Sequence, residues 1–77
     1  MQFEGNDLII SIDSQMYRFP LSNISKKLLK ADNTERNIYK ISLSGYGIHW
    51  LIIDEDLSID SLLKLAQLNH YQLPKVS

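Results

Sequence analysis

Residues 48–66 constrain the fold most strongly, because a strand pattern and a helix pattern follow each other there with only a short gap. The run I-H-W-L-I-I, residues 48–53, is apolar except for His49 and predicts a buried strand. Ser58 is a suitable N-cap for a helix. Four apolar residues then recur at the helical period: Ile59, Leu62, Leu63 and Ala66. These patterns predict a domain that mixes strands with helices.

The N-terminal half repeats this sequence of strand signals followed by a helix signal. Residues 8–12 and 16–19 predict a β-hairpin, and the absence of glycine between them favours a loop of three or four residues. A helix is expected from an N-cap at Ser22 to about Ala31. A further strand is expected over residues 38–43. The predicted fold is therefore a small two-layer α+β domain in the order β-β-α-β-β-α, with a mostly antiparallel sheet and two helices.

Length and composition narrow the class of protein. With 77 residues, the chain is expected to form one domain over 1–77, ordered from about 6 to 70 and frayed over 74–77. The absence of cysteine excludes disulfides and thiolate zinc sites and favours a cytoplasmic location. A net charge of -1 argues against general nucleic-acid binding. No run approaches the roughly 18 apolar residues of a membrane span, so no membrane association is expected.

The segment G-Y-G-I-H-W-L-I-I-D-E-D-L-S, residues 45–58, holds the residue types that active sites use. His49 has no nucleophile that the local pattern places beside it, and no known catalytic motif is present. The adjacent acids 54–56 alternate in direction on a strand, so they cannot converge on a metal ion without a turn. We therefore expect no catalytic residue, no metal site and no cofactor.

A structural interpretation accounts for the same letters. Gly45 and Gly47 suit a turn, and Trp50 suits the core. Asp54 or Asp56 is expected to accept backbone N–H groups where the strand meets the helix capped by Ser58. His49 is then a structural histidine on the outer face of its strand.

The candidate contact surface lies elsewhere in the sequence. Leu65 and Leu68 fall outside the inward stripe of the second helix, and Tyr71 lies just beyond it. These residues predict an interface with a second copy or with a different protein, unless they are ordinary scattered surface residues. Lys26, Lys27 and Lys30 share one helix face, which is either a solvated surface or a contact for an acidic partner.

The chain resembles a family of small bacterial proteins catalogued as domain of unknown function 2442. The resemblance rests on residues 45–63, G-Y-G-I-H-W-L-I-I-D-E-D-L-S-I-D-S-L-L, and extends back through 34–42 and 19–31 to cover about residues 8–65. Family members often carry proline after the tryptophan, where Leu51 stands here, and Asp-Gly in the first hairpin, where this chain has Asp13-Ser14. The resemblance implies a compact α+β unit without an established catalytic centre.

The resemblance also implies a partner. Such proteins are frequently encoded beside a small protein of the family catalogued as domain of unknown function 4160, in what resembles a toxin–antitoxin pair. The leading hypothesis is thus a non-enzymatic, cytoplasmic protein-binding module that masks a small toxin-like partner. The alternatives are a homodimer, a DNA-binding autoregulator, an enzyme centred on His49 and a purely structural domain. Only five residues could form the basic surface of a DNA-binding protein: Lys26, Lys27, Lys30, Arg36 and Lys40.

Overall fold

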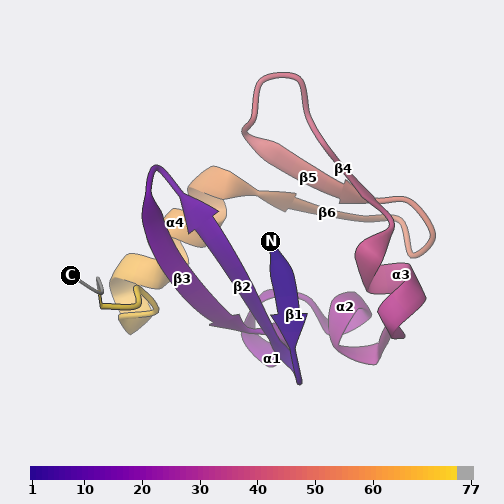
Figure 1. Ribbon diagram of the computed structural model, residues 1–77, viewed down its shortest axis with the longest axis horizontal. Coiled ribbons are helices and arrows are strands. Elements are labelled where there is room, and N and C mark those ends of the chain that lie inside the picture. Colours follow the sequence, from indigo (N-terminus) through magenta and orange to yellow (C-terminus); the bar gives the residue numbers. More distant parts are fainter. Residues whose placement is uncertain (75–77) are drawn as a thin grey trace.

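Ten helices and strands make up the part of the chain that the computed structural model describes, residues 1–74 (Figure 1). In chain order they are β1 (Gln2–Glu4), β2 (Asp7–Ile12), β3 (Gln15–Pro20), α1 (Leu21–Ile24), α2 (Lys26–Lys30), α3 (Asn33–Asn37), β4 (Tyr39–Ile41), β5 (Gly47–Trp50), β6 (Glu55–Ser58) and α4 (Ile59–Asn69). The α+β class is confirmed, as is the succession of strands, helices, strands and a final helix. Of the tail expected to fray, residues 75–77 lie outside the described residues.

The strands form two antiparallel sheets rather than one, in the orders β1-β2-β3 and β4-β5-β6. Each sheet contains one strand that the sequence patterns missed, β1 in the first and β6 in the second. Both missed strands are short, and they are rich in polar letters, as in E-D-L-S of β6. The strand predicted over 48–53 ends at Trp50, because residues 51–54 form the turn that leads into β6.

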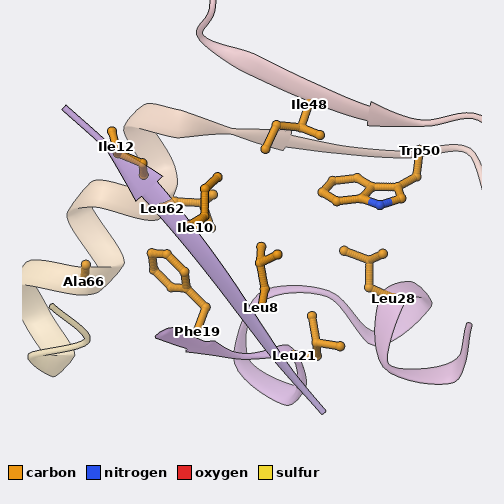
Figure 2. Close-up of a cluster of buried hydrophobic side chains, with 10 residues drawn as sticks. All are labelled: Leu8, Ile10, Ile12, Phe19, Leu21, Leu28, Ile48, Trp50, Leu62 and Ala66. Carbon is orange, nitrogen blue, oxygen red and sulfur yellow. The ribbon is translucent and has the colours of Figure 1, made fainter. Parts of the chain in front are cut away.

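The core lies between the two sheets and is closed by helices (Figure 2). Trp50 from β5 and Phe19 from β3 are the largest fully buried side chains. Aliphatic residues from β2, α1, α2, β5 and α4 complete the cluster, namely Leu8, Ile10, Ile12, Leu21, Leu28, Ile48, Leu62 and Ala66. All four apolar residues predicted for the inward face of α4 contact this cluster: Leu62 and Ala66 belong to it, and Ile59 and Leu63 pack against it.

The predicted helix over residues 22–31 is two short helices separated at Ser25. The backbone of Ser25 is extended, and its Oγ accepts a hydrogen bond from the Leu28 N–H at 3.1 Å, so Ser25 is the N-cap of α2. The expected N-cap, Ser22, lies inside α1, which follows Pro20 and has no side-chain cap. In this arrangement the buried Ser25 hydroxyl satisfies the Leu28 N–H, one of the amides at the start of α2 that have no partner within the helix.

The first hairpin turns through two residues, so the predicted loop of three or four residues is wrong. Ile12 pairs with Gln15, and the residues between them, Asp13 and Ser14, have φ values of 50° and 67°. Two consecutive positive φ values are the signature of a type I′ turn, whose twist matches that of the flanking strands. Aspartate tolerates this conformation, but serine in the second position is strained.

Replacing Ser14 with glycine is therefore expected to stabilise the domain by roughly 0.5–1 kcal/mol. Glycine adopts the positive φ of Ser14 without steric cost, and this gain exceeds the extra entropy that glycine has in the unfolded chain. Urea denaturation would show a higher midpoint with an unchanged slope. A lower midpoint would show that the strain at Ser14 is negligible.

The C-terminal segment after α4 covers the outer edge of β3. The Arg18 N–H donates to the Tyr71 carbonyl at 3.0 Å, and the Leu73 N–H donates to the Met16 carbonyl at 2.8 Å. His70 allows this return, because its left-handed conformation (φ 56°) ends α4 and reverses the chain. One edge of the first sheet is thereby closed by the chain itself.

Candidate functional site

The second sheet turns one face to the core and the other to solvent. Ile48 and Trp50 point inward, and His49 between them points outward. The pairing register places Lys40 of β4 opposite His49, and His49 opposite Asp56 of β6. The side chains of Lys40, His49 and Asp56 therefore form one row across the outer face.

A hollow of about 550 Å³ lies over this outer face. Its floor includes Gly47, which contributes no side chain. On either side of Gly47 lie Ser42, which directly follows β4, and Ser58 of β6. Leu43 and Tyr46 from the loop between β4 and β5 line its apolar side. An apolar wall with a few convergent polar groups is the usual composition of a binding site.

His49 is held between two carboxylates. Its Nδ1 lies 2.7 Å from an Asp56 Oδ1, within hydrogen-bonding distance, and its Nε2 lies 3.9 Å from an Asp54 Oδ1. Asp54 reaches this position because it occupies the β5–β6 turn with a φ of 50°. The expectation that Asp54 or Asp56 would accept backbone N–H groups before α4 is therefore wrong, because both carboxylates turn toward the imidazole instead.

The chemistry available to this histidine is limited by its surroundings. The ligand atoms of His49, Asp54 and Asp56 lie within 4.8 Å of one another, and imidazole and carboxylate are acceptable metal ligands. However, both aspartates are largely exposed, and the Nδ1 of His49 is already engaged by Asp56. A hydrogen bond between a partly exposed imidazole and an exposed carboxylate accounts for this group, and such a surface contact contributes little to stability in water.

The loop between β4 and β5 carries the most exposed apolar side chains of this sheet. Leu43 is fully exposed, Tyr46 is 65% exposed and Ile41 at the end of β4 is 59% exposed. Figure 1 shows the loop projecting from the rest of the fold. The sequence patterns assigned these residues to a strand and a turn without identifying them as a surface. The available signal was the phase conflict between Ile38 and Ile41, which indicated that one face of the strand is incompletely buried.

Three residues of the motif in 45–58 fix the backbone around this surface, namely Gly45, Trp50 and Ser58. Gly45 has a φ of 78°, which a residue with a Cβ rarely adopts, so this glycine is required by the loop. Trp50 is fully buried, and its indole N–H donates to the Arg36 carbonyl at 2.9 Å. Ser58 is the N-cap of α4 as predicted, accepting from the Ser61 N–H at 3.3 Å.

A family model described as protein of unknown function (DUF2442) matches residues 2–67. The chain belongs to this family. The match covers both sheets and most of α4, and it confirms the resemblance that the motif in residues 45–63 indicated. No curated protein matches this DUF2442 chain. No solved structure matches it either. Within residues 1–74, no helix has the length and apolar character needed to cross a membrane.

The residues predicted as a contact surface in this DUF2442 chain do not lie together on one exposed face. Leu68 is 79% exposed, but Leu65 is half-buried. Tyr71 is not turned outward, because its ring packs edge-on against Phe19 with a centroid distance of 5.7 Å. The hydroxyl of Tyr71 also accepts a hydrogen bond from the Asn23 side chain at 2.6 Å. Tyr71 therefore stabilises the fold.

The lysines of α2 are exposed, which fits both a solvated face and a contact for an acidic partner. Lys26 and Lys30 are exposed to solvent, and Lys27 donates from Nζ to the Asp54 carbonyl at 3.1 Å. Lys27 thus links α2 to the β5–β6 turn. Arg36, grouped with these residues as a basic surface, is buried instead, and it donates hydrogen bonds to the backbone carbonyls of Leu28, Leu29 and Gly5.

Proposed function

We propose that this DUF2442 chain is a non-enzymatic protein-binding module that masks a protein partner, in the manner of the antitoxin of a two-gene pair. The contact surface in this proposal is the outer face of the second sheet together with its projecting loop. We call this whole contact surface, the hollow together with its apolar side, the hairpin surface. It is defined by Lys40, Ser42, Leu43, Tyr46, Gly47 and His49.

The observation that carries the proposal is the exposure of Leu43 and Tyr46 beside the hollow. Single exposed apolar residues are ordinary, whereas apolar side chains grouped at a concave site mark contact surfaces. Tyrosine is also enriched among the residues that supply most of the binding energy in protein interfaces. Burial of these two side chains by a partner would supply the apolar centre of an interface.

The polar groups of the hairpin surface define the partner's chemistry. His49 is paired with Asp56, which offsets the charge of that carboxylate when the imidazole is protonated. Lys40 forms no ion pair within residues 1–74. A carboxylate of the partner placed near Lys40, with an apolar side chain in the hollow, would complement this surface.

The surroundings of His49 also support a non-enzymatic role. A histidine that acts as a general base needs a nucleophile within hydrogen-bonding reach of one ring nitrogen. Here one nitrogen is bonded to Asp56 and the other faces Asp54. Ser42, the serine beside Gly47, instead accepts the Gly47 N–H at 3.1 Å and bonds to Ser44.

Co-expression with the product of the neighbouring gene tests the proposal. We expect a complex to co-purify with the tagged chain, and we expect Leu43→Asp combined with Tyr46→Asp to weaken it by on the order of a hundredfold, since two central apolar contacts would be lost. Titration calorimetry would measure the change. Circular dichroism should be unaltered, because both side chains are exposed in the free chain.

Leu68→Asp is the matched control, because it adds a charge at a similarly exposed leucine on α4. This variant should bind the partner normally. If Leu68→Asp abolishes the complex and the double variant does not, the contact surface is on α4. If no complex forms with the unmodified chain, the protein-binding proposal is wrong.

Operator DNA binding is the alternative. Fewer exposed basic residues are present for it than the five that the sequence offers. With Arg36 buried, the basic residues left for it are Lys26, Lys27, Lys30 and Lys40, and Lys27 is bonded to the Asp54 carbonyl. A gel-shift titration with DNA from upstream of the gene, at low salt where phosphate contacts are strongest, would test it. A sequence-specific shift by the isolated chain would favour this alternative.

A further inference from the structure

The β4 strand lies at the end of its sheet with an open edge. β4 pairs only with β5, as the order β4-β5-β6 shows. The Ser42 N–H donates to the Gly47 carbonyl, and the Leu51 N–H donates to the Ile38 carbonyl. Because antiparallel strands alternate the direction of their backbone groups, Ser42, Lys40 and Ile38 bond toward β5. The N–H and C=O groups of Tyr39 and Ile41 therefore point away from the sheet.

The two sheets differ in how their edges are covered. The C-terminal segment pairs with β3 through Tyr71 and Leu73. Within residues 1–74, no corresponding segment pairs with β4. Natural proteins protect exposed edges, because a row of unpaired backbone groups with apolar side chains is a template for another strand. Here the open edge carries Ile41, which is 59% exposed.

Ile41 also borders an apolar gap between the two sheets. This gap has a volume of about 270 Å³, and its apolar lining comes from Ile41 and Ile48 of the second sheet, from Ile59 of α4, and from Met1, Ile10 and Ile12. Ser11, Asp13 and Gly45 also line it. A strand added beside β4 would bring its own apolar side chain next to Ile41, at the mouth of this gap. The edge therefore offers both unpaired backbone groups and uncovered apolar surface.

The side chains of β4 select a second copy in one register. If two copies pair antiparallel about Ile41, the two Ile41 residues face each other as a hydrogen-bonded pair on the inner face, and Lys40 lies opposite Ser42 of the other copy. If they pair about Lys40, two lysines lie opposite each other at the closest spacing, which is unfavourable. A pairing about Tyr39 would place Ile41 opposite Asn37, which belongs to α3. The register about Ile41 therefore joins apolar to apolar residues without opposing like charges and without pairing a strand with a helix.

We propose that two copies of this chain associate through β4, with the two-fold axis at Ile41, to form a continuous six-stranded sheet. The contact is isologous, so it closes as a dimer and does not propagate. Each Ile41 N–H donates to the Ile41 carbonyl of the other copy. The dimer joins the two strands through the outward backbone groups of Ile41. The side chains of Lys40 and Ser42, which belong to the hairpin surface, lie beside this seam on the outer face.

Single cysteines test the register, because the chain contains no cysteine of its own. Opposite residues in a hydrogen-bonded antiparallel pair have Cα atoms about 5.5 Å apart, within the range of a disulfide. Ile41→Cys is expected to form a covalent dimer under mild oxidation at least about tenfold faster than Leu68→Cys, which reports random collision. Faster cross-linking of Lys40→Cys than of Ile41→Cys, or equal rates at positions 41 and 68, would overturn the proposal.

Sedimentation of the unmodified chain and of Ile41→Pro provides the second test. Proline removes the outward N–H of Ile41 without removing a bond to β5, so the fold should persist by circular dichroism. Both hydrogen bonds at the two-fold axis are lost, and dimer dissociation should rise by on the order of tenfold or more. A monomer at all concentrations in the unmodified chain would refute the dimer. Complex formation with the neighbouring gene product is a separate readout, so failure of either proposal is recognised independently.

Discussion

Replacing Arg36 with methionine is expected to lower the free energy of unfolding by about 3–5 kcal/mol. Arg36 is buried in α3, and its guanidinium donates to three backbone carbonyls at 2.9–3.1 Å. These carbonyls belong to Leu28, Leu29 and Gly5, so one side chain joins α2 and the β1–β2 turn to α3. Methionine fills similar space but donates nothing, so all three carbonyls would lose the guanidinium as a donor, and the bonds that join α2 and the β1–β2 turn to α3 would be lost.

Urea denaturation followed by the fluorescence of Trp50, the only tryptophan, would measure this loss. Arg36→Lys should recover part of the stability, because an ammonium group can reach one or two of the carbonyls but cannot span all three. Arg18→Met is the matched control. Arg18 is half-exposed on β3, and its pKa is raised mainly by the hydrogen bond to Asp7, so its replacement should change the midpoint little. Equal losses in the two methionine variants would contradict the role assigned to Arg36.

Trp50→Ala is expected to destabilise the domain by about 3–5 kcal/mol, a large share of the roughly 5–15 kcal/mol by which native domains are stable. Trp50 is fully buried between the sheets and contacts Phe3 edge-on at a centroid distance of 6.4 Å. Its removal would leave a large cavity at the base of the second sheet (Figure 2). The Arg36 carbonyl would also lose the indole N–H that it accepts.

Trp50→Phe separates these two contributions. Phenylalanine keeps most of the apolar contact but lacks the N–H, so this variant should lose about 1–3 kcal/mol. Circular dichroism during thermal unfolding is the measurement, since the fluorescent residue is absent. If Trp50→Phe is as unstable as Trp50→Ala, the hydrogen bond to Arg36 dominates and the packing contribution has been overestimated.

Arg36 and Trp50 together explain how the hairpin surface is supported. The Trp50 side chain fixes the end of β5, and its bond to Arg36 ties β5 to α3, which leads directly into β4. The base of the β4–β5 hairpin is therefore rigidly attached to the core. Its loop, with Leu43 and Tyr46, is free of the core and exposed.

Elements with a clear hydrophobic period were predictable from the sequence. The inward stripe of α4, its N-cap at Ser58 and the outward direction of His49 all follow from local pattern. The strands β1 and β6 were not predictable, because Q-F-E and E-D-L-S lack the apolar alternation that indicates a strand. They are strands because neighbouring strands provide hydrogen-bond partners, which is a tertiary effect.

The candidate site was harder to predict for the same reason. Periodicity identified Leu68 as exposed, but it could not show that the chain reverses at His70 and packs Tyr71 against Phe19. The acids at 54–56 were expected to converge only through a turn, and the sequence did not show that residues 51–54 form one. That turn, with the positive φ of Asp54, brings Asp54 and Asp56 to His49. Arg36 looked like a surface residue because its three acceptors come from distant backbone positions, and no local pattern reveals them.

Hydrogen–deuterium exchange of the chain, with and without the product of the neighbouring gene, tests the hairpin surface most directly. The partner is expected to slow exchange over residues 40–49 while leaving the second half of α4 unchanged, relative to the same chain alone at the same concentration. Slowed exchange in α4 around Leu68, with residues 40–49 unaffected, would contradict the account.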